Sequence, residues 1–199
     1  MQKRKRSQKD TKAKLLKAAL DIFSKDGYDA ATTRHIAKKA GVNESLIHRY
    51  FKSKLGLFFA LKQQFREKLI KQFLAYDESA NIEEELVRFI TSRLQSTKQD
   101  KKFFKLAISR AILDPKVRED MRSYASMKPP ELVERFERFR SKDQIRKDVD
   151  LDQMIGVLHS LSFAFSILMD GIESLKKEDA EKLIKSAANI LTKGLAPRR

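Results

Sequence analysis

The stretch that decides the fold is residues 32–54, TTRHIAKKAGVNESLIHRYFKSK. Apolar residues recur at helical spacing on both sides of Gly41, which predicts two short helices joined by a tight turn. Either of the first two threonines can cap the first helix, and Gly41 supplies the left-handed conformation in which helices commonly end. Asn43 is a strong cap for the second helix, predicted over residues 44–50. This pattern is typical of a helix-turn-helix.

The outward face of the second helix carries Glu44, Ser45, His48 and Arg49, side chains suited to base edges and phosphates. The alternative is a generic helical hairpin with a solvated polar face. The charge distribution favours DNA, because residues 1–62 hold sixteen Lys and Arg residues but only five acidic ones. A concentrated positive end indicates a polyanionic partner. Since these cations do not lie opposite a broad aromatic face, we expect nucleic acid and no membrane partner.

The sequence around the hairpin carries a family resemblance. An amphipathic helix is predicted over about residues 10–25, and a second one begins at Leu55. Residues 11–61 resemble the DNA-binding domain of the TetR family of transcriptional regulators. The matching residues are the apolar ones from Ala18 to Phe23, Gly27-Tyr28, Thr32-Thr33, Ile36-Ala37-x-x-Ala40-Gly41-Val42 and Tyr50-Phe51-x-x-Lys54. The resemblance covers about a quarter of the chain, and the remainder matches the family only in its all-helical layout and length.

The resemblance and the polar face together predict which residues contact double-stranded DNA. The set is Thr33, Arg34, Asn43, Glu44, Ser45, His48, Arg49, Tyr50 and Lys54. Phosphate contacts are expected from Arg34, Tyr50 and Lys54. Base-edge contacts are expected from Ser45, His48 and Arg49. If Lys54 does contact phosphate, its removal should lower the salt dependence of binding by about one unit.

Two residues depart from the family pattern. His48 stands where these proteins commonly have a Tyr that touches phosphate, so that contact is expected to be weaker or sensitive to pH. Glu44 places a carboxylate at the start of the second helix. It could accept a hydrogen bond from a cytosine amino group or favour the helix dipole, and we favour the dipole.

The rest of the chain is predicted to be all-α. Helical patterns cover residues 55–76, 82–96, 101–113, 117–127, 131–140, 150–172 and 177–193, and no strand-like alternation occurs. The first nine residues, MQKRKRSQK, are expected to be a disordered basic tail, either an arm along the DNA groove or merely solvated. We expect a three-helix DNA-binding domain over residues 1–54 and a helical ligand-binding and dimerisation domain over residues 55–199.

The sequence lacks the residues of a catalytic, cofactor or metal site. There is no Cys, only three His, and no Gly-rich phosphate loop, so we expect no enzyme activity, no cofactor and no metal. Asp148-x-Asp150-x-Asp152 opens like a calcium loop, but Gln153 and His159 occupy the positions of its Gly and Glu. The apolar run over residues 154–169 is too short to span a bilayer, and a cytoplasmic location is expected.

The last two helices carry apolar residues on more than one side, and a helix of this kind must bury both sides. The residues alone leave a large monomeric core and a dimer equally open. The resemblance implies a homodimer in which these helices pair across a two-fold axis. The predicted interface is Leu161, Phe165, Leu168, Leu183, Ile184, Ala187 and Leu191. A dimer also suits a pseudo-palindromic operator, whose half-sites lie about one duplex turn apart.

The resemblance also implies a small-molecule site in an apolar cavity among the middle helices. For most of the aromatic and Met side chains there, core packing is the simpler interpretation. The predicted lining is Phe65, Phe104, Ala107, Met121, Tyr124, Gly156, His159 and Phe163. His159 is either a satisfied core histidine or a polar anchor for the ligand. The predicted function is a repressor released from DNA by an apolar effector, and the alternative is a constitutive DNA-binding dimer with no effector.

Overall fold

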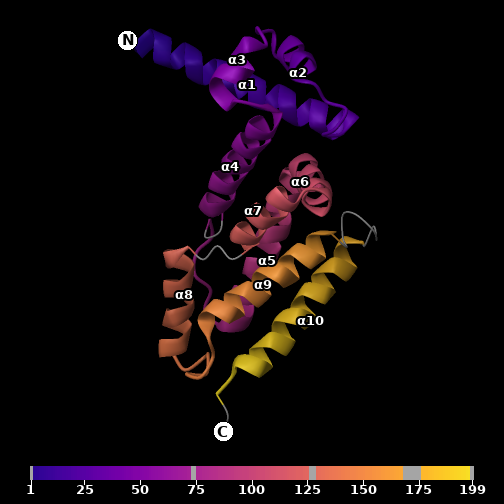
Figure 1. Ribbon diagram of the computed structural model, residues 1–199. Coiled ribbons are helices and arrows are strands. Elements are labelled where there is room, and N and C mark those ends of the chain that lie inside the picture. Colours follow the sequence, from indigo (N-terminus) through magenta and orange to yellow (C-terminus); the bar gives the residue numbers. More distant parts are fainter. Residues whose placement is uncertain (1, 73–74, 126–128, 168–175, 198–199) are drawn as a thin grey trace. The chain divides into compact units, whose positions relative to one another are not determined.

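The computed structural model describes residues 2–72, 75–125, 129–167 and 176–197, and within them the chain forms ten α-helices and no strand (Figure 1). The all-α prediction is confirmed. The helices are α1 Gln2–Asp26, α2 Thr33–Ala40, α3 Ser45–Phe51, α4 Lys54–Gln72, α5 Ile82–Gln99, α6 Lys101–Leu113, α7 Pro115–Ala125, α8 Pro130–Ser141, α9 Leu151–Ile167 and α10 Lys177–Leu195.

The chain divides into two compact units, of which the first comprises Met1–Lys68 and Asp100–Asp120. Its central helix is α1, which packs against both α2 and α6. The buried face of α1 consists of residues at helical spacing, Leu15, Ala18, Ala19, Ile22 and Phe23. Because α6 packs on α1, the first unit takes in residues that lie far beyond the helix-turn-helix in sequence. The expected domain boundary between residues 54 and 55 stays a prediction.

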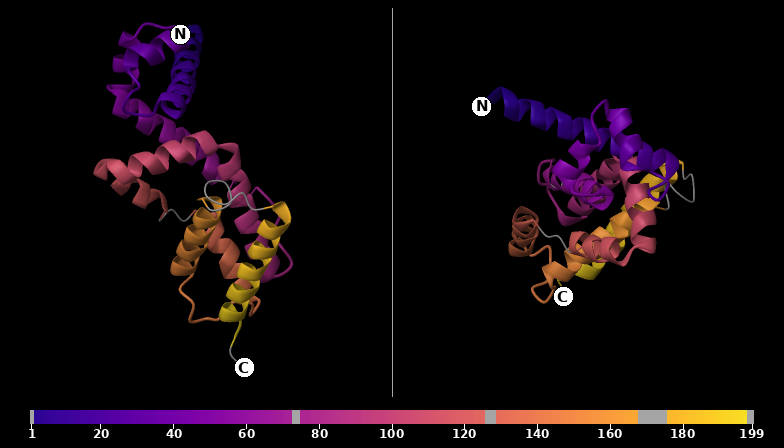
Figure 2. Two further views of the ribbon diagram at one scale, coloured as in Figure 1. Left: turned by 90° about the vertical axis from the view of Figure 1, so that its right-hand side faces the viewer. Right: turned by 45° about the horizontal axis from the view of Figure 1, so that its top comes forward.

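The second unit comprises Leu69–Gln99 and Met121–Arg199. Its core is built around α5, which packs against α9 and α10, while α8 packs against α9; Figure 2 shows these helices from two more sides. The largest side chains buried there are Phe89, Phe136 and Phe139, with Leu86 and Ile90 beside them. These residues come from α5 and α8, so the two middle helices supply much of the core.

The first helix differs from its prediction. Residues 2–9 continue α1 as helix, where the sequence analysis expects a disordered tail. These residues include no Pro and no Gly, and a basic stretch without helix breakers can extend a helix whose later turns are packed. Predicted and observed ends agree at residues 101–113 for α6. The predicted end of the long apolar helix, at residue 172, lies outside the described residues.

The helices were also compared with the length and hydropathy that a bilayer requires. Among the described residues, none is both long and apolar enough to cross a membrane.

Candidate DNA-binding interface

Helix α2 begins and ends as its sequence predicts. The Thr32 hydroxyl accepts a hydrogen bond from the His35 N–H at 3.1 Å and caps the helix. At the other end Gly41 has a φ of 67°, the left-handed conformation, and Val42 donates from its N–H to the Ala37 carbonyl at 3.1 Å. That bond pattern is a Schellman ending, which turns the chain sharply toward α3.

Helix α3 starts at a side-chain cap and is held by its inner face. The Asn43 side chain accepts a hydrogen bond from the Ser45 N–H at 2.8 Å, which fills the predicted capping role. Ile47 is fully buried and Phe51 nearly so. With these two residues facing inward, Ser45, His48 and Arg49 are left exposed, and Tyr50 is half-buried. The side chains predicted to reach base edges therefore share the solvent face of one short helix.

The turn from α3 into α4 is tight. Gly56, in the first turn of α4, lies against the Phe51 carbonyl so closely that a Cβ atom could not be placed there without a shift. Ser53 caps this turn by accepting a hydrogen bond from the Gly56 N–H at 3.0 Å. Gly56 could not be recognised from the sequence, because its neighbours fit an ordinary helix and give no sign of the close approach.

Two of the predicted DNA contacts bind each other. The Thr33 hydroxyl donates to the Glu44 carboxylate, with 2.5 Å between the oxygens, and so ties the start of α2 to the start of α3. Hydrogen bonds to a charged acceptor are stronger than neutral ones. The Glu44 carboxylate therefore has a partner within the helix-turn-helix. Neither of the two expected roles, a hydrogen bond from a cytosine amino group or an interaction with the helix dipole, includes this contact.

Lys54 also has partners within the protein. Its ammonium group donates to the backbone carbonyls of Tyr28 at 2.9 Å, Asp29 at 3.2 Å and Ala31 at 2.9 Å. It lies 4.6 Å from the centre of the Tyr28 ring. An ammonium has three donors, and these three bonds use all of them. Lys54, expected at a phosphate, therefore holds the loop between α1 and α2 against the start of α4.

The same loop is also held by α6. Arg110 lies over the Tyr28 ring, with its guanidinium carbon 4.3 Å from the ring centre. It pairs with Asp29 at 3.1 Å and with Asp114 at 2.7 Å. Tyr28 is thus flanked by two cations, and its burial raises the pKa of its hydroxyl above the ordinary value. Cation–π contacts of this kind make the loop a rigid support for α2.

Several cations remain available for a polyanion. Arg34, Lys38 and Lys52 are exposed and make no ion pair within the part of the chain that the structure describes. Lys12 of α1 lies 5.4 Å and Arg49 lies 5.9 Å from the centre of the Tyr50 ring. The exposed face of α3 is therefore bordered by positive charge from α1, α2 and its own last turn, the electrostatic pattern of a nucleic-acid site.

A capped helical pair with an exposed polar second helix and a basic border defines a helix-turn-helix DNA-binding protein. Residues 15–61 match the model of the bacterial regulatory proteins of the tetR family. An uncharacterized HTH-type transcriptional regulator of Bacillus subtilis strain 168, YvkB, is 26% identical over 193 residues, which cover 94% of this chain and 97% of that protein. Residues 15–61 are thus similar to the DNA-binding part of tetR-family regulators, and nearly the whole chain is similar to an HTH-type transcriptional regulator.

Two further comparisons cover a part of the chain and nearly all of it. The HTH-type transcriptional activator FasR of Mycolicibacterium smegmatis is 36% identical over 61 residues, covering 31% of this chain and 28% of that protein. The solved structure of Salmonella enterica GusR has a TM-score of 0.75 at 19% identity and covers 92% of this chain and 95% of that one. The second likeness concerns the fold of nearly the whole chain.

The residues predicted to line a ligand cavity are divided between the two units. Phe65, Phe104 and Ala107 belong to the first unit, and Met121, Gly156, His159 and Phe163 to the second, while the Tyr124 side chain lies outside the described ones. The Phe65 ring stacks on Phe103 with 4.0 Å between centres. Phe104 and Ala107 are buried. In the first unit these residues act as core, the simpler of the two interpretations.

His159 is buried in the second unit. Its ring meets that of Phe89 edge-on, with 5.5 Å between centres. Burial, with a smaller contribution from Arg93, lowers its pKa to about 3, so the imidazole is neutral at pH 7. This environment fits a core histidine. Phe163, which lies on the same helix, is 40% exposed.

The residues predicted at the dimer interface have different environments. Phe165 and Ile184 are buried in the core of their own unit, and Leu161, Ala187 and Leu191 pack against that core. Leu168 lies outside the described residues. Leu183 is 41% exposed. The apolar side chains that α9 and α10 expose most are Val157 at 54% and Ile190 at 70%, neither of which the sequence analysis selected.

Proposed function

We propose that this chain is a homodimeric transcriptional repressor that binds a pseudo-palindromic operator through α3 and leaves it when a small molecule binds. The observation that carries the proposal is the exposed row of Ser45, His48 and Arg49 on a helix capped at both ends. A protein of this kind works in the cytoplasm, beside the chromosome.

The DNA contacts follow from which side chains are available. Arg49, His48 and Ser45 are assigned to base edges, since they share the solvent face of α3. Arg34 and Lys52 are assigned to phosphates, because both are exposed cations without ion-pair partners among the described residues. Lys54 is given a structural role in place of its expected phosphate contact, because its three donors already bind carbonyls.

The second subunit is assigned to the exposed apolar side chains of α9 and α10. On α10, Leu183, Ala187 and Ile190 follow one another at spacings of four and three residues, so they share one face. Leu183 and Ile190 are 41% and 70% exposed, which is unusual for large apolar residues of a packed helix. A symmetric contact between two copies over this face would bury these side chains. It would also allow the two α3 helices of the dimer to bind one duplex.

Whether the protein represses or activates transcription depends on the position of its operator relative to the promoter. The residues of α3 do not determine that position. The relative FasR is named as an activator, so the DNA-binding sequence is compatible with either direction. The second candidate function is a DNA-binding dimer without an effector. It is favoured by the burial of Phe103, Phe104 and Ala107 in the first unit, because side chains packed together in a core leave no space for a ligand among them.

The proposal is tested by selecting binding sites for the full-length protein from random duplexes. The expected result is a recovered site with two inverted half-sites whose centres are about one duplex turn apart. Arg49→Ala should alter the recovered sequence, and Lys185→Ala, an exposed cation on α10, should not. Recovery of no common sequence would contradict sequence-specific recognition, and a single half-site would contradict the dimer.

A further inference from the structure

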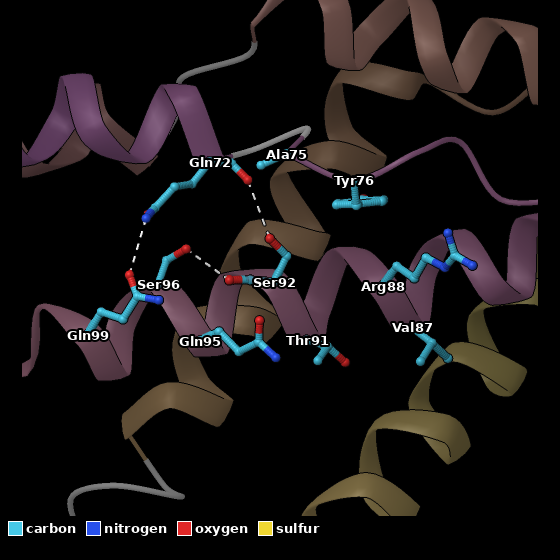
Figure 3. Close-up of a pocket in the computed structure, with 10 residues that line it drawn as sticks. All are labelled: Gln72, Ala75, Tyr76, Val87, Arg88, Thr91, Ser92, Gln95, Ser96 and Gln99. Atoms are coloured by element: carbon cyan, nitrogen blue, oxygen red, sulfur yellow. Dashed lines mark hydrogen bonds between the residues drawn. The ribbon is translucent and has the colours of Figure 1, made fainter.

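The second unit contains an open groove of about 480 Å³, which Figure 3 shows in close-up. Its lining comes from the end of α4, the segment that follows it, and one face of α5. Most of the lining side chains are polar and uncharged. The ten residues are Gln72, Ala75, Tyr76, Val87, Arg88, Thr91, Ser92, Gln95, Ser96 and Gln99. A concave site of this volume lies within the range that small-molecule ligands occupy in proteins.

The walls of the groove are joined by hydrogen bonds between lining residues. The Gln72 amide donates to the Gln99 side-chain oxygen at 3.3 Å, and the Ser92 hydroxyl donates to the Gln72 carbonyl at 3.4 Å. The Ser96 hydroxyl, in turn, donates to the Ser92 carbonyl at 2.9 Å (Figure 3). The two bonds of Gln72 hold the end of α4 beside α5, whereas the Ser96 bond lies within α5, so the groove is formed without a ligand.

The rim of the groove is fixed by a buried carboxylate. Glu85 is fully buried and accepts hydrogen bonds from the Tyr76 hydroxyl at 2.9 Å, the Ser79 N–H at 3.0 Å and Arg135 at 3.2 Å. Burial, reinforced by the Glu85 charge, raises the pKa of Tyr76 well above its ordinary value, so the phenol stays protonated. The Tyr76 hydroxyl bond to Glu85, together with the Arg135 bond to the Tyr76 carbonyl at 3.2 Å, fixes the position of Tyr76 in the lining.

The lining chemistry selects the class of ligand. The Gln72 side-chain oxygen Oε1 is buried and accepts no hydrogen bond from the part of the chain that the structure describes. Thr91 and Gln95 add a hydroxyl and an amide on the same face of α5. Among the described lining residues there is no carboxylate, and the one cation, Arg88, donates to the Asp77 carbonyl at 3.2 Å.

A purely apolar ligand is a poor match for the polar groups of this lining. It would cover their donors and acceptors and give them no hydrogen-bond partner, which is costly. A ligand with several hydroxyl groups can pair with amides and hydroxyls in both directions, as donor and as acceptor. Sites built to hydrogen-bond their ligand discriminate strongly against analogues that lack the matching groups.

We infer that this groove binds a neutral, polyhydroxylated small molecule of the sugar class, and that this molecule is the effector. The second statement rests on the proposed function, whereas the first rests on the groove alone. The inferred ligand is recognised by Thr91 and Gln95 and differs from the apolar effector that the family resemblance implies.

The test is thermal unfolding of the full-length protein with two panels of compounds. One panel holds neutral mono- and disaccharides, including N-acetylated ones, and the other holds straight-chain fatty acids. At least one sugar is expected to raise the Tm by several degrees at saturation, because it binds the native state. Gln95→Leu and Thr91→Val, which remove an amide and a hydroxyl from the surface of α5, should each weaken that sugar at least tenfold. Gln64→Leu, an exposed glutamine of α4 outside the groove, is the matched control and should bind normally.

Three results would overturn the inference: stabilisation only by fatty acids, stabilisation by neither panel, or a sugar response that survives in both groove variants. Binding of the selected duplex is measured on the same samples without sugar. If the duplex binds and no sugar does, this inference fails and the DNA-binding function stands. If a sugar binds and no duplex does, the proposed function fails and the groove remains a ligand site.

Discussion

Lys54→Met is the substitution that most sharply separates a structural lysine from a DNA contact. Methionine keeps the apolar stem and removes the ammonium that binds the Tyr28, Asp29 and Ala31 carbonyls. Two of these bonds are part-buried and one is exposed. A hydrogen bond to a charged group is worth about 1.5–3 kcal/mol when buried, and less with solvent access. Counting the two part-buried bonds at about 1 kcal/mol each, with about 0.5 kcal/mol for the cation–π contact, gives a loss of about 2–3 kcal/mol.

The assay pairs urea unfolding with operator affinity measured across a salt series. We expect Lys54→Met to lower the stability of the DNA-binding unit and to leave the slope of log affinity against log salt unchanged. Arg34→Ala should do the opposite, reducing the slope by about 0.9 per subunit and so by about 1.8 for the dimer, because each copy loses one phosphate contact. Lys105→Met, an exposed lysine of α6, controls for the loss of a charge. A Lys54→Met protein of normal stability with a slope reduced by about 1.8, or about 0.9 per subunit, would refute the structural role.

Three other predictions concern the turn, the subunit contact and the buried histidine. Gly56→Ala should cost several kcal/mol, because its Cβ meets the Phe51 carbonyl, whereas Gly41→Ala should cost only about 1 kcal/mol, for the left-handed backbone; comparable losses in urea unfolding would contradict this. Ile190→Glu should convert the dimer to a folded monomer in sedimentation and weaken operator binding, so a variant that sediments as a dimer would move the contact elsewhere. The folded pKa of His159, about 3, lies below its ordinary value of 6.5, so the unfolded chain binds the extra proton and stability falls as the pH drops from 6.5 toward 3. His159→Gln should therefore remove up to about 4 kcal/mol of acid sensitivity in that window, and an unchanged pH profile would argue against a buried neutral imidazole.

The helix-turn-helix could be predicted because its determinants are local. Thr32, Gly41 and Asn43 each act on backbone groups within a few residues, and the structure places all three in the capping roles that their chemistry favours. The burial of Ile36 and Ile47 likewise follows from helical periodicity. Local rules of this kind need no knowledge of the rest of the chain.

Side chains that reach distant partners could not be assigned from sequence. Lys54 bonds to carbonyls more than twenty residues earlier, and Arg110 pairs with Asp29 across 81 positions. A lysine beside a basic motif looks like a phosphate contact until those carbonyls are located. The packing of α6 on α1 was missed for the same reason, because an amphipathic helix does not specify which apolar face it meets.

The candidate ligand groove could not be predicted from the sequence either. Arg88, Thr91, Gln95 and Gln99 follow helical spacing on α5, and such a polar stripe is read as a solvated surface. Only the end of α4, brought beside that stripe by Gln72, makes it concave. Phe65 and Phe104 are expected to line a cavity because they are aromatic. In the structure they pack in the core of the first unit or against it.

The central claim is that α3 recognises the sequence of a DNA duplex. It is tested most directly by the ratio of two binding affinities. The affinity of the full-length protein for its selected duplex is compared with that for a scrambled duplex of equal length at one fixed salt concentration. We predict a preference of about a thousandfold or more, as specific DNA-binding proteins show, and a fall of at least tenfold in that ratio for Arg49→Ala. Equal affinities for the two duplexes, or a ratio that Arg49→Ala leaves unchanged, would contradict the account.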